Sequence, residues 1–170
     1  METAFYILLI IGHLGLFDVL YYHNYKCNLH ELEHARTEVV IHTARHLIYA
    51  LQFLYIANFR AYGIWIWLPI FIYLLDIIIA LMDIWVEPEA RKPQGGLPRG
   101  EYFMHIVLSM LVGMYLILVL QQLYLDFELP TNFKYSPPHV PKVLTFYMTI
   151  MGMATIVFFI FDSFRLSKRT

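Results

Sequence analysis

The side chains best suited to chemistry gather in residues 28–59, where the sequence predicts one long helix beginning near Asn28. At 100° per residue, a set of polar residues falls within about 40° of Glu38 on this helix. The set comprises Glu31, His34, Glu38, His42, Arg45, Tyr49 and Gln52, with His30 and His46 beside it. The later part of the helix is apolar, so this polar stripe is expected to face protein or water rather than lipid.

Two further segments carry acids and a histidine at helical spacing. Asp76, Asp83 and Glu87 follow one another at offsets of seven and four residues, so they share one face of a helix. Glu101 and His105 lie one turn apart on the next helix. Imidazole and carboxylate groups without thiolates suit iron, manganese or zinc. Because carboxylates in a dry place repel one another, we expect a dinuclear site whose bridging carboxylates are neutralised by the metal ions.

The composition predicts the elements that position these residues. Of 170 residues, 59% are apolar and 15% are charged, whereas about a quarter would be charged in a soluble domain. Apolar runs long enough to cross about 30 Å of hydrocarbon recur along the chain. We therefore predict an all-α, multi-pass transmembrane helical bundle that forms a single domain over 1–170. Its five spans are expected at about 4–22, 39–59, 64–86, 102–125 and 143–161.

The distribution of lysine and arginine predicts the orientation of this bundle. One side carries Lys26, Arg91, Lys92, Arg99, Arg165, Lys168 and Arg169, and the other carries Arg60, Lys134 and Lys142. The more basic side is expected to be cytoplasmic, which places the N-terminus outside and the C-terminus inside. We thus expect a bacterial inner membrane or an equivalent membrane, with the metal site towards the cytoplasmic side and membrane lipids around the chain. The net charge of −1 gives no reason to expect nucleic acid as a partner.

With this orientation, polar groups of the second, third and fourth spans converge at one depth. The predicted inner metal ligands are Glu38, His42, Asp83, Glu87, Glu101 and His105. Glu31, His34 and His46 are expected to be further ligands or to orient the ligand imidazoles. Arg45, Asp76 and Tyr49 are expected to support the ligands from behind. Cys27 is the only cysteine, so a thiolate metal cluster is excluded. No residue is assigned a catalytic role beyond metal binding.

The histidine spacing resembles that of a known enzyme class. His30 and His34, and again His42 and His46, each form an H-x-x-x-H pair. Such pairs are similar to one element of the histidine boxes in integral-membrane di-iron desaturases and hydroxylases, although the H-x-x-H-H box of those families is absent. Glu38, Glu101 and His105 also resemble ligands of helical-bundle di-iron carboxylate enzymes, with a spacing of four rather than three between Glu101 and His105. The resemblance implies oxygen-activating iron chemistry.

Several of these residues also have simpler interpretations. His13 can be a hydrogen-bonded packing residue, and His23 and His30 can lie at the headgroup level. Glu31 can belong to a solvated helix start that Asn28 caps. Arg91 lies in a Pro- and Gly-rich hairpin, over 91–100, that is either a plain connection or a lid meeting an anionic group.

The sequence therefore favours a membrane-embedded, metal-dependent oxidoreductase of the hydroxylase or desaturase type. Two iron ions are expected as cofactor, with zinc or manganese as alternatives. A lipid-soluble small molecule is expected as substrate and an electron-donor protein as a partner. One alternative is a b-type haem electron-transfer or quinone-reactive subunit, with His42 or His46 and His105 as axial ligands. Another is a proton or divalent-cation transporter.

Overall fold

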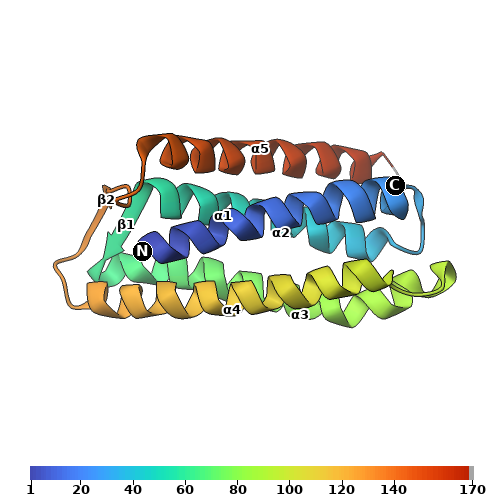
Figure 1. The fold of residues 1–170 in the computed structure, drawn as a ribbon, viewed down its shortest axis with the longest axis horizontal. Coiled ribbons are helices and arrows are strands. Elements are labelled where there is room, and N and C mark those ends of the chain that lie inside the picture. Colours follow the sequence, from blue (N-terminus) through green and yellow to red (C-terminus); the bar gives the residue numbers. More distant parts are fainter. Residues whose placement is uncertain (169–170) are drawn as a thin grey trace.

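The chain folds into a bundle of five long helices, described by a computed structural model over residues 1–168 (Figure 1). The long helices are α1 (Glu2–Phe17), α2 (Arg36–Asn58), α3 (Trp67–Arg91), α4 (Arg99–Phe127) and α5 (Lys142–Ser167). Helix makes up 82% of the structure, which confirms the all-α prediction. All five helical segments are long and apolar enough to cross a membrane.

Shorter elements join these helices. A π-helix, η1 (Asp18–Lys26), continues α1, and a 3-10 turn, η2 (Leu29–Glu31), precedes α2. Another two 3-10 turns, η3 (Gly63–Ile66) and η4 (Lys92–Gln94), flank α3. Strands β1 (Phe59–Tyr62) and β2 (Asn132–Tyr135) pair antiparallel, with Phe59 opposite Tyr135. This small sheet ties the α2–α3 connection to the α4–α5 connection and was not predicted.

The start of α2 corrects the sequence analysis. The predicted helix begins near Asn28, but α2 begins at Arg36. Asn28 has a positive φ of 47° and makes no side-chain cap hydrogen bond, so it forms a left-handed turn rather than a helix cap. Asparagine tolerates this conformation better than most residues. The chain leaves helical geometry again at Leu32, whose backbone is extended, so residues 28–35 do not continue into α2 and the helical wheel does not apply to them.

The two halves of the bundle differ in what they bury. Near the sheet, the interior is mostly apolar and includes Phe5, Leu8, Phe53 and Ile56, with a single ion pair between Arg60 and the buried Asp126 described there. At the other end, where η1, the start of α2 and the α3–α4 connection meet, the interior holds histidines and carboxylates (Figure 1). Large apolar side chains instead cover much of the outer surface, as at Trp85, which is 86% exposed. The bundle is thus apolar outside and partly polar inside, which is the reverse of a soluble protein.

Candidate metal centre

Arg91 is the buried anchor of the polar half. As the last residue of α3, it is completely buried, and its Nε donates to both Glu38 carboxylate oxygens at 2.9 and 3.0 Å. Its Nη2 lies 2.8 Å from Glu38 Oε1 and donates to Glu101 Oε1 at 2.7 Å. One guanidinium therefore joins α2, α3 and α4. Arg91 was predicted to belong to the hairpin over 91–100, but it is the last residue of α3, and residues 92–98 form the connection.

The π-helix η1 adds two residues that the sequence analysis did not assign to the site. An α-helix would turn Asp18 and His23 about 140° apart, but a π-helix hydrogen-bonds i to i+5 and aligns them. His23 Nε2 lies 3.3 Å from Asp18 Oδ2 and 3.3 Å from Glu101 Oε1, and all three residues are buried. His23 is therefore part of the buried cluster, whatever its depth in a membrane.

Two groups of metal-ligand type share His23. In the first, one ligand atom from each of Asp18, His23, Glu101 and His105 lies within 4.8 Å of the others. In the second, the same holds for His23, Glu38 and His42. The imidazoles of His23 and His42 pack edge to face with ring centroids 4.4 Å apart. The two groups therefore adjoin, and together they draw on η1, α2 and α4.

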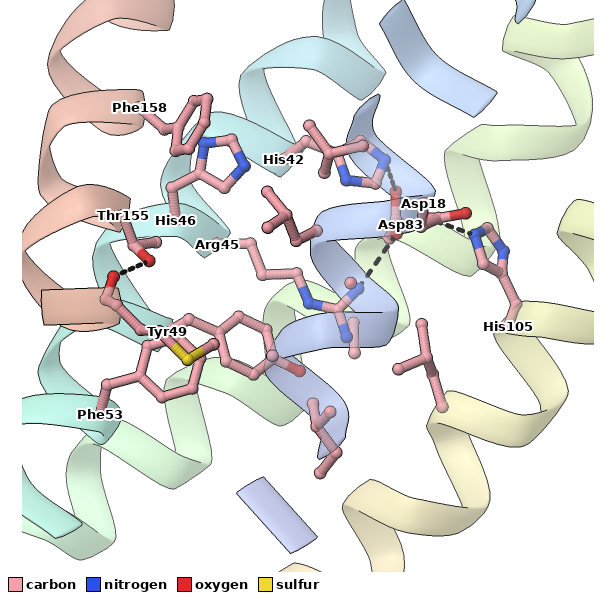
Figure 2. A pocket seen from close by; sticks show the side chains of 18 of the residues that line it. Asp18, His42, Arg45, His46, Tyr49, Phe53, Asp83, His105, Thr155 and Phe158 are labelled. Carbon is pink, nitrogen blue, oxygen red and sulfur yellow. Dashed lines mark hydrogen bonds and ion pairs between the residues drawn. The ribbon is translucent and has the colours of Figure 1, made fainter. Parts of the chain in front are cut away.

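Helix α3 supplies two more carboxylates at the margin of these groups. Asp83 Oδ1 lies 3.3 Å from His42 Nε2, and Glu87 Oε1 lies 3.4 Å from His105 Nδ1. His105 Nε2 in turn lies 3.4 Å from Asp18 Oδ2. Figure 2 shows His42, Asp83, Asp18 and His105 in this sequence around one end of a pocket. All six predicted inner ligands thus come together.

The contact distances within the cluster fall into two ranges, and the longer range includes the separation of two ligands on one metal ion. The Arg91 contacts are 2.7 to 3.0 Å long, as charge-assisted hydrogen bonds should be. The contacts between histidine nitrogens and carboxylates are longer, 3.3 to 3.7 Å. Two ligands each about 2.1 Å from one metal ion lie about 3.0–3.4 Å apart at octahedral or tetrahedral angles.

Several buried polar atoms of the cluster lack a well-formed hydrogen bond. Five buried atoms of the cluster form no hydrogen bond within residues 1–168: Asp18 Oδ1, His23 Nε2, His42 Nε2, Asp83 Oδ1 and Glu87 Oε1. Four of these atoms lie 3.3–3.7 Å from the opposite group of a histidine–carboxylate contact. Native structures generally complete such poorly formed buried contacts with protein, water or an ion.

The cluster also holds more carboxylates than permanent cations. Five carboxylates, from Asp18, Glu38, Asp83, Glu87 and Glu101, share the guanidinium of Arg91 and part of that of Arg45. Arg45 is also shared with Asp76, at 3.7 Å from its Nε. With neutral histidines, at least three negative charges are therefore left without a counter-charge. A pair of divalent ions, or protons on the histidines, would compensate them.

Three predicted ligands lie elsewhere. Glu31 is in η2, half-exposed, with its Oε1 3.3 Å from Arg165 Nη2. His34 is exposed in the turn before α2. Both were placed on the polar stripe by a helix that does not extend that far, so that placement is wrong. His46 is on α2 as predicted, but its Nδ1 faces Asp162 Oδ2 at 3.3 Å, away from the two ligand groups.

The predicted supporting residues form a second layer. Arg45 Nη1 donates to Asp83 Oδ2 at 3.4 Å, and its guanidinium lies over the Tyr49 ring. Gln52 Nε2 donates to Asp76 Oδ2 at 3.0 Å. Arg45 therefore connects the buried Asp76 to the cluster through Asp83, and the α2 stripe from Glu38 to Gln52 is confirmed.

Cys27 adjoins the cluster without joining it. Its Sγ donates to Glu101 Oε2 over 3.9 Å. Desolvation raises the pKa of the Cys27 thiol, so the sulfur is protonated at neutral pH. A protonated thiol is a poor metal ligand, which agrees with a centre built from nitrogen and oxygen.

A cavity of about 220 Å³ extends from the cluster into the apolar part of the bundle. Its polar end is formed by Asp18, His42, Asp83, Glu87 and His105 (Figure 2). The remaining wall is mostly apolar and is contributed by all five long helices. The candidate metal centre therefore borders a space that a small apolar group could occupy.

Comparisons with known proteins give no further indication of function. No family model, no curated protein and no solved structure matches the chain.

Proposed function

We propose that the chain is a membrane-embedded, metal-dependent oxidoreductase of the hydroxylase or desaturase type, with a dinuclear non-haem iron centre. The observation that carries the proposal is the convergence of three histidines and three carboxylates in two adjoining ligand groups, with Asp83 and Glu87 at their margin and an apolar cavity beside them. Zinc and manganese are the other ions that this donor set accepts. The resemblance of the histidine spacing to membrane di-iron enzymes supports iron.

Residue roles follow from the contacts. Asp18, His23, Glu101 and His105 would hold one ion, and Glu38, His42 and Asp83 the other. Arg91 keeps Glu38 and Glu101 apart from bulk water and fixes their orientation. Glu87 lies against His105 Nδ1 and would fix the direction of that imidazole.

The proposed reaction would consume electrons and protons as well as dioxygen. Iron supplies the capacity to bind and activate dioxygen. In a hydroxylation, one oxygen atom enters a C–H bond of the substrate and the other leaves as water, which consumes two electrons and two protons. We therefore include an electron-donor protein among the proposed partners, as the source of these two electrons.

Apolar outer surfaces and the basic end support the membrane part of the proposal. The ends of η1, α3 and α5 and the start of α4 meet at one end of the bundle and carry Lys26, Lys92, Arg99, Arg165 and Lys168 (Figure 1). Arg169 belongs to the same predicted set but lies outside the described residues. By the positive-inside rule this end faces the cytoplasm, with the metal centre close to it.

Metal content and absorption spectra test the proposal. Protein purified in detergent is expected to hold about two iron ions per chain, as the two ligand groups require. His105→Ala should lose iron, whereas His34→Ala, which removes an exposed histidine at the same end, should keep it. Iron retained in the His105 variant would contradict the proposal. A Soret band would favour haem instead, and metal-free protein that conducts cations in liposomes would favour transport.

A further inference from the structure

We propose that His30, Asp162 and His46 form a proton path that leads from the basic end of the bundle to the cavity beside the candidate metal centre. The three residues lie outside the two ligand groups and come from η2, α5 and α2. The inference goes beyond the proposed function, because it concerns proton transfer between side chains and applies to the metal-free chain.

Asp162 is the centre of the path. It is the only acidic residue of α5 and is 6% exposed, although most of this helix is apolar. Its two oxygens face different imidazoles: His30 Nε2 lies 3.6 Å from Oδ1, and His46 Nδ1 lies 3.3 Å from Oδ2. A carboxyl group with one imidazole at each oxygen can accept a proton at one oxygen and release a proton from the other. Ionisable groups within membrane-spanning helices are costly and commonly mark proton pathways.

The spacing of these three residues favours proton transfer over metal binding. Ligand atoms that are each about 2.1 Å from one metal ion lie at most about 4.2 Å apart. Within the described part of the chain, His30, His46 and Asp162 do not form a group whose ligand atoms all lie within 4.8 Å of one another. Each imidazole is close to Asp162, but the three residues do not surround one point. The carboxyl group therefore connects the two histidines in a line.

The inner end of the path is His46, whose side chain lines the cavity. Its Nδ1 is buried and faces Asp162. Figure 2 shows the imidazole at the wall of the pocket, next to Phe158, with its other nitrogen directed into the pocket. The ring centroids of His46 and Phe158 are 6.0 Å apart, so the phenyl ring restricts rotation of the imidazole. His46 can therefore accept a proton at Nδ1 and release one from Nε2 into the cavity.

The outer end of the path is His30, which lies between two of the segments long and apolar enough to span a membrane. This turn belongs to the end of the bundle where the basic residues gather (Figure 1). The His30 side chain is 11% exposed, and that of the adjacent Glu31 is 55% exposed. Water therefore reaches this turn, and a proton can enter the path at His30.

Transfer along the path moves one proton and no electrons. Asp162 starts as the neutral acid, with its proton on Oδ2. When His30 gains a proton from water at Nδ1, its Nε2 passes one to Asp162 Oδ1. Oδ2 then gives its proton to His46 Nδ1, and His46 Nε2 releases one into the cavity. The separations of 3.3 and 3.6 Å exceed those of good hydrogen bonds by a few tenths of an ångström, so a small movement of the imidazoles closes the path.

Hydrogen exchange at the His46 ring tests the inference. The full chain, free of metal and labelled with nitrogen-15 histidine, is transferred in nanodiscs into deuterium oxide, and the loss of each ring N–H signal is followed by NMR. His46→Gln identifies the His46 signal. Exchange at His46 is expected to slow at least about tenfold in His30→Ala and in Asp162→Asn, because each removes a positioned proton carrier. His34→Ala, which removes an exposed histidine near the same turn, should exchange as the wild type does.

Imidazole in the buffer should restore the exchange in His30→Ala, because it can replace the missing proton carrier. Loss of a purely structural contact would not be rescued in this way. Equal exchange at His46 in His30→Ala and the wild type, or the absence of rescue, would overturn the inference. So would equal slowing at His23, which is buried but not on the path.

The outcome does not depend on iron, since the metal-free chain is used. If the chain binds no iron but His46 exchanges through His30, the proposed function fails and the proton path stands. If iron binds but exchange is independent of His30, the reverse holds. Where both hold, the path supplies protons that the reduction of dioxygen consumes.

Discussion

At the scale of the residue, Arg91 determines whether the polar half can form. Its guanidinium lies between Glu38 and Glu101, and all three side chains are completely buried. Removing one partner of such a pair leaves an uncompensated charge in the interior, which costs about 3–5 kcal/mol. The single arginine therefore contributes to stability and also orients two of the proposed ligands.

We expect Arg91→Met to lower the thermal unfolding temperature strongly, because Glu38 and Glu101 lose their counter-ion. Arg91→Lys should be intermediate, since an ammonium group cannot reproduce the forked contacts to two carboxylates. Unfolding followed by circular dichroism in detergent measures both variants. Arg99→Met is the control, because Arg99 is exposed at the start of α4. An Arg91→Met protein as stable as the Arg99 control would contradict this role.

At the scale of the element, the π-helix η1 and the start of α4 approach unusually closely. A Cβ on Gly100 would collide with the Tyr22 hydroxyl oxygen, while the nearest ring carbon would be 3.3 Å away. Tyr22 belongs to η1, which carries Asp18 and His23, and Gly100 precedes Glu101. Close packing of these two elements therefore keeps the first ligand group together.

Gly100→Ala is expected to push η1 away from α4 and to weaken metal binding by at least about tenfold, a typical effect of disturbing ligand orientation. Adding Tyr22→Phe removes the colliding oxygen and should restore binding. Metal titration of the two variants measures this. Gly113→Ala, with open space around its Cβ, serves as the control. The packing explanation fails if Tyr22→Phe gives no rescue.

Some helices and site residues could be predicted from the sequence, and others could not. Hydrophobic runs predicted α3, α4 and α5 well, because long apolar stretches leave little choice of structure. The stripe from Glu38 to Gln52 followed from helical periodicity and is correct. Asp18 and His23 were missed because their alignment depends on a π-helix, and Arg91 because no local pattern distinguishes a buried arginine from a loop arginine. The later start of α2 was missed because the break lies at Leu32, where an extended backbone has no distinctive signal in the sequence.

At the scale of the whole molecule, the bundle separates an apolar half from a polar half. The paired hydroxyls of Tyr73 and Tyr115, 3.0 Å apart, lie within the largely apolar half. The polar half lies at the end where the chain terminates and where the basic residues gather (Figure 1). The proposed orientation thus predicts which compartment supplies electrons and protons to the metal centre.

Reporter fusions at the C-terminus test this orientation. Green fluorescent protein fused after residue 170 should fluoresce, because it folds in the cytoplasm, and alkaline phosphatase fused at the same point should be inactive. Fusions after Asn132, in the connection at the opposite end, should give the reverse pattern and serve as the internal control. An active phosphatase at the C-terminus would invert the proposed topology.

The position of His23 affects the order in which metal ions would bind to the proposed centre. It belongs to both ligand groups, yet a neutral imidazole offers a single nitrogen lone pair. If two ions bind as proposed, the first would take that nitrogen, and the second would meet a more oxygen-rich and weaker set of donors. The two proposed positions would then be unequal, and they would fill one after the other. A form holding one ion would accumulate on the way to the full complement.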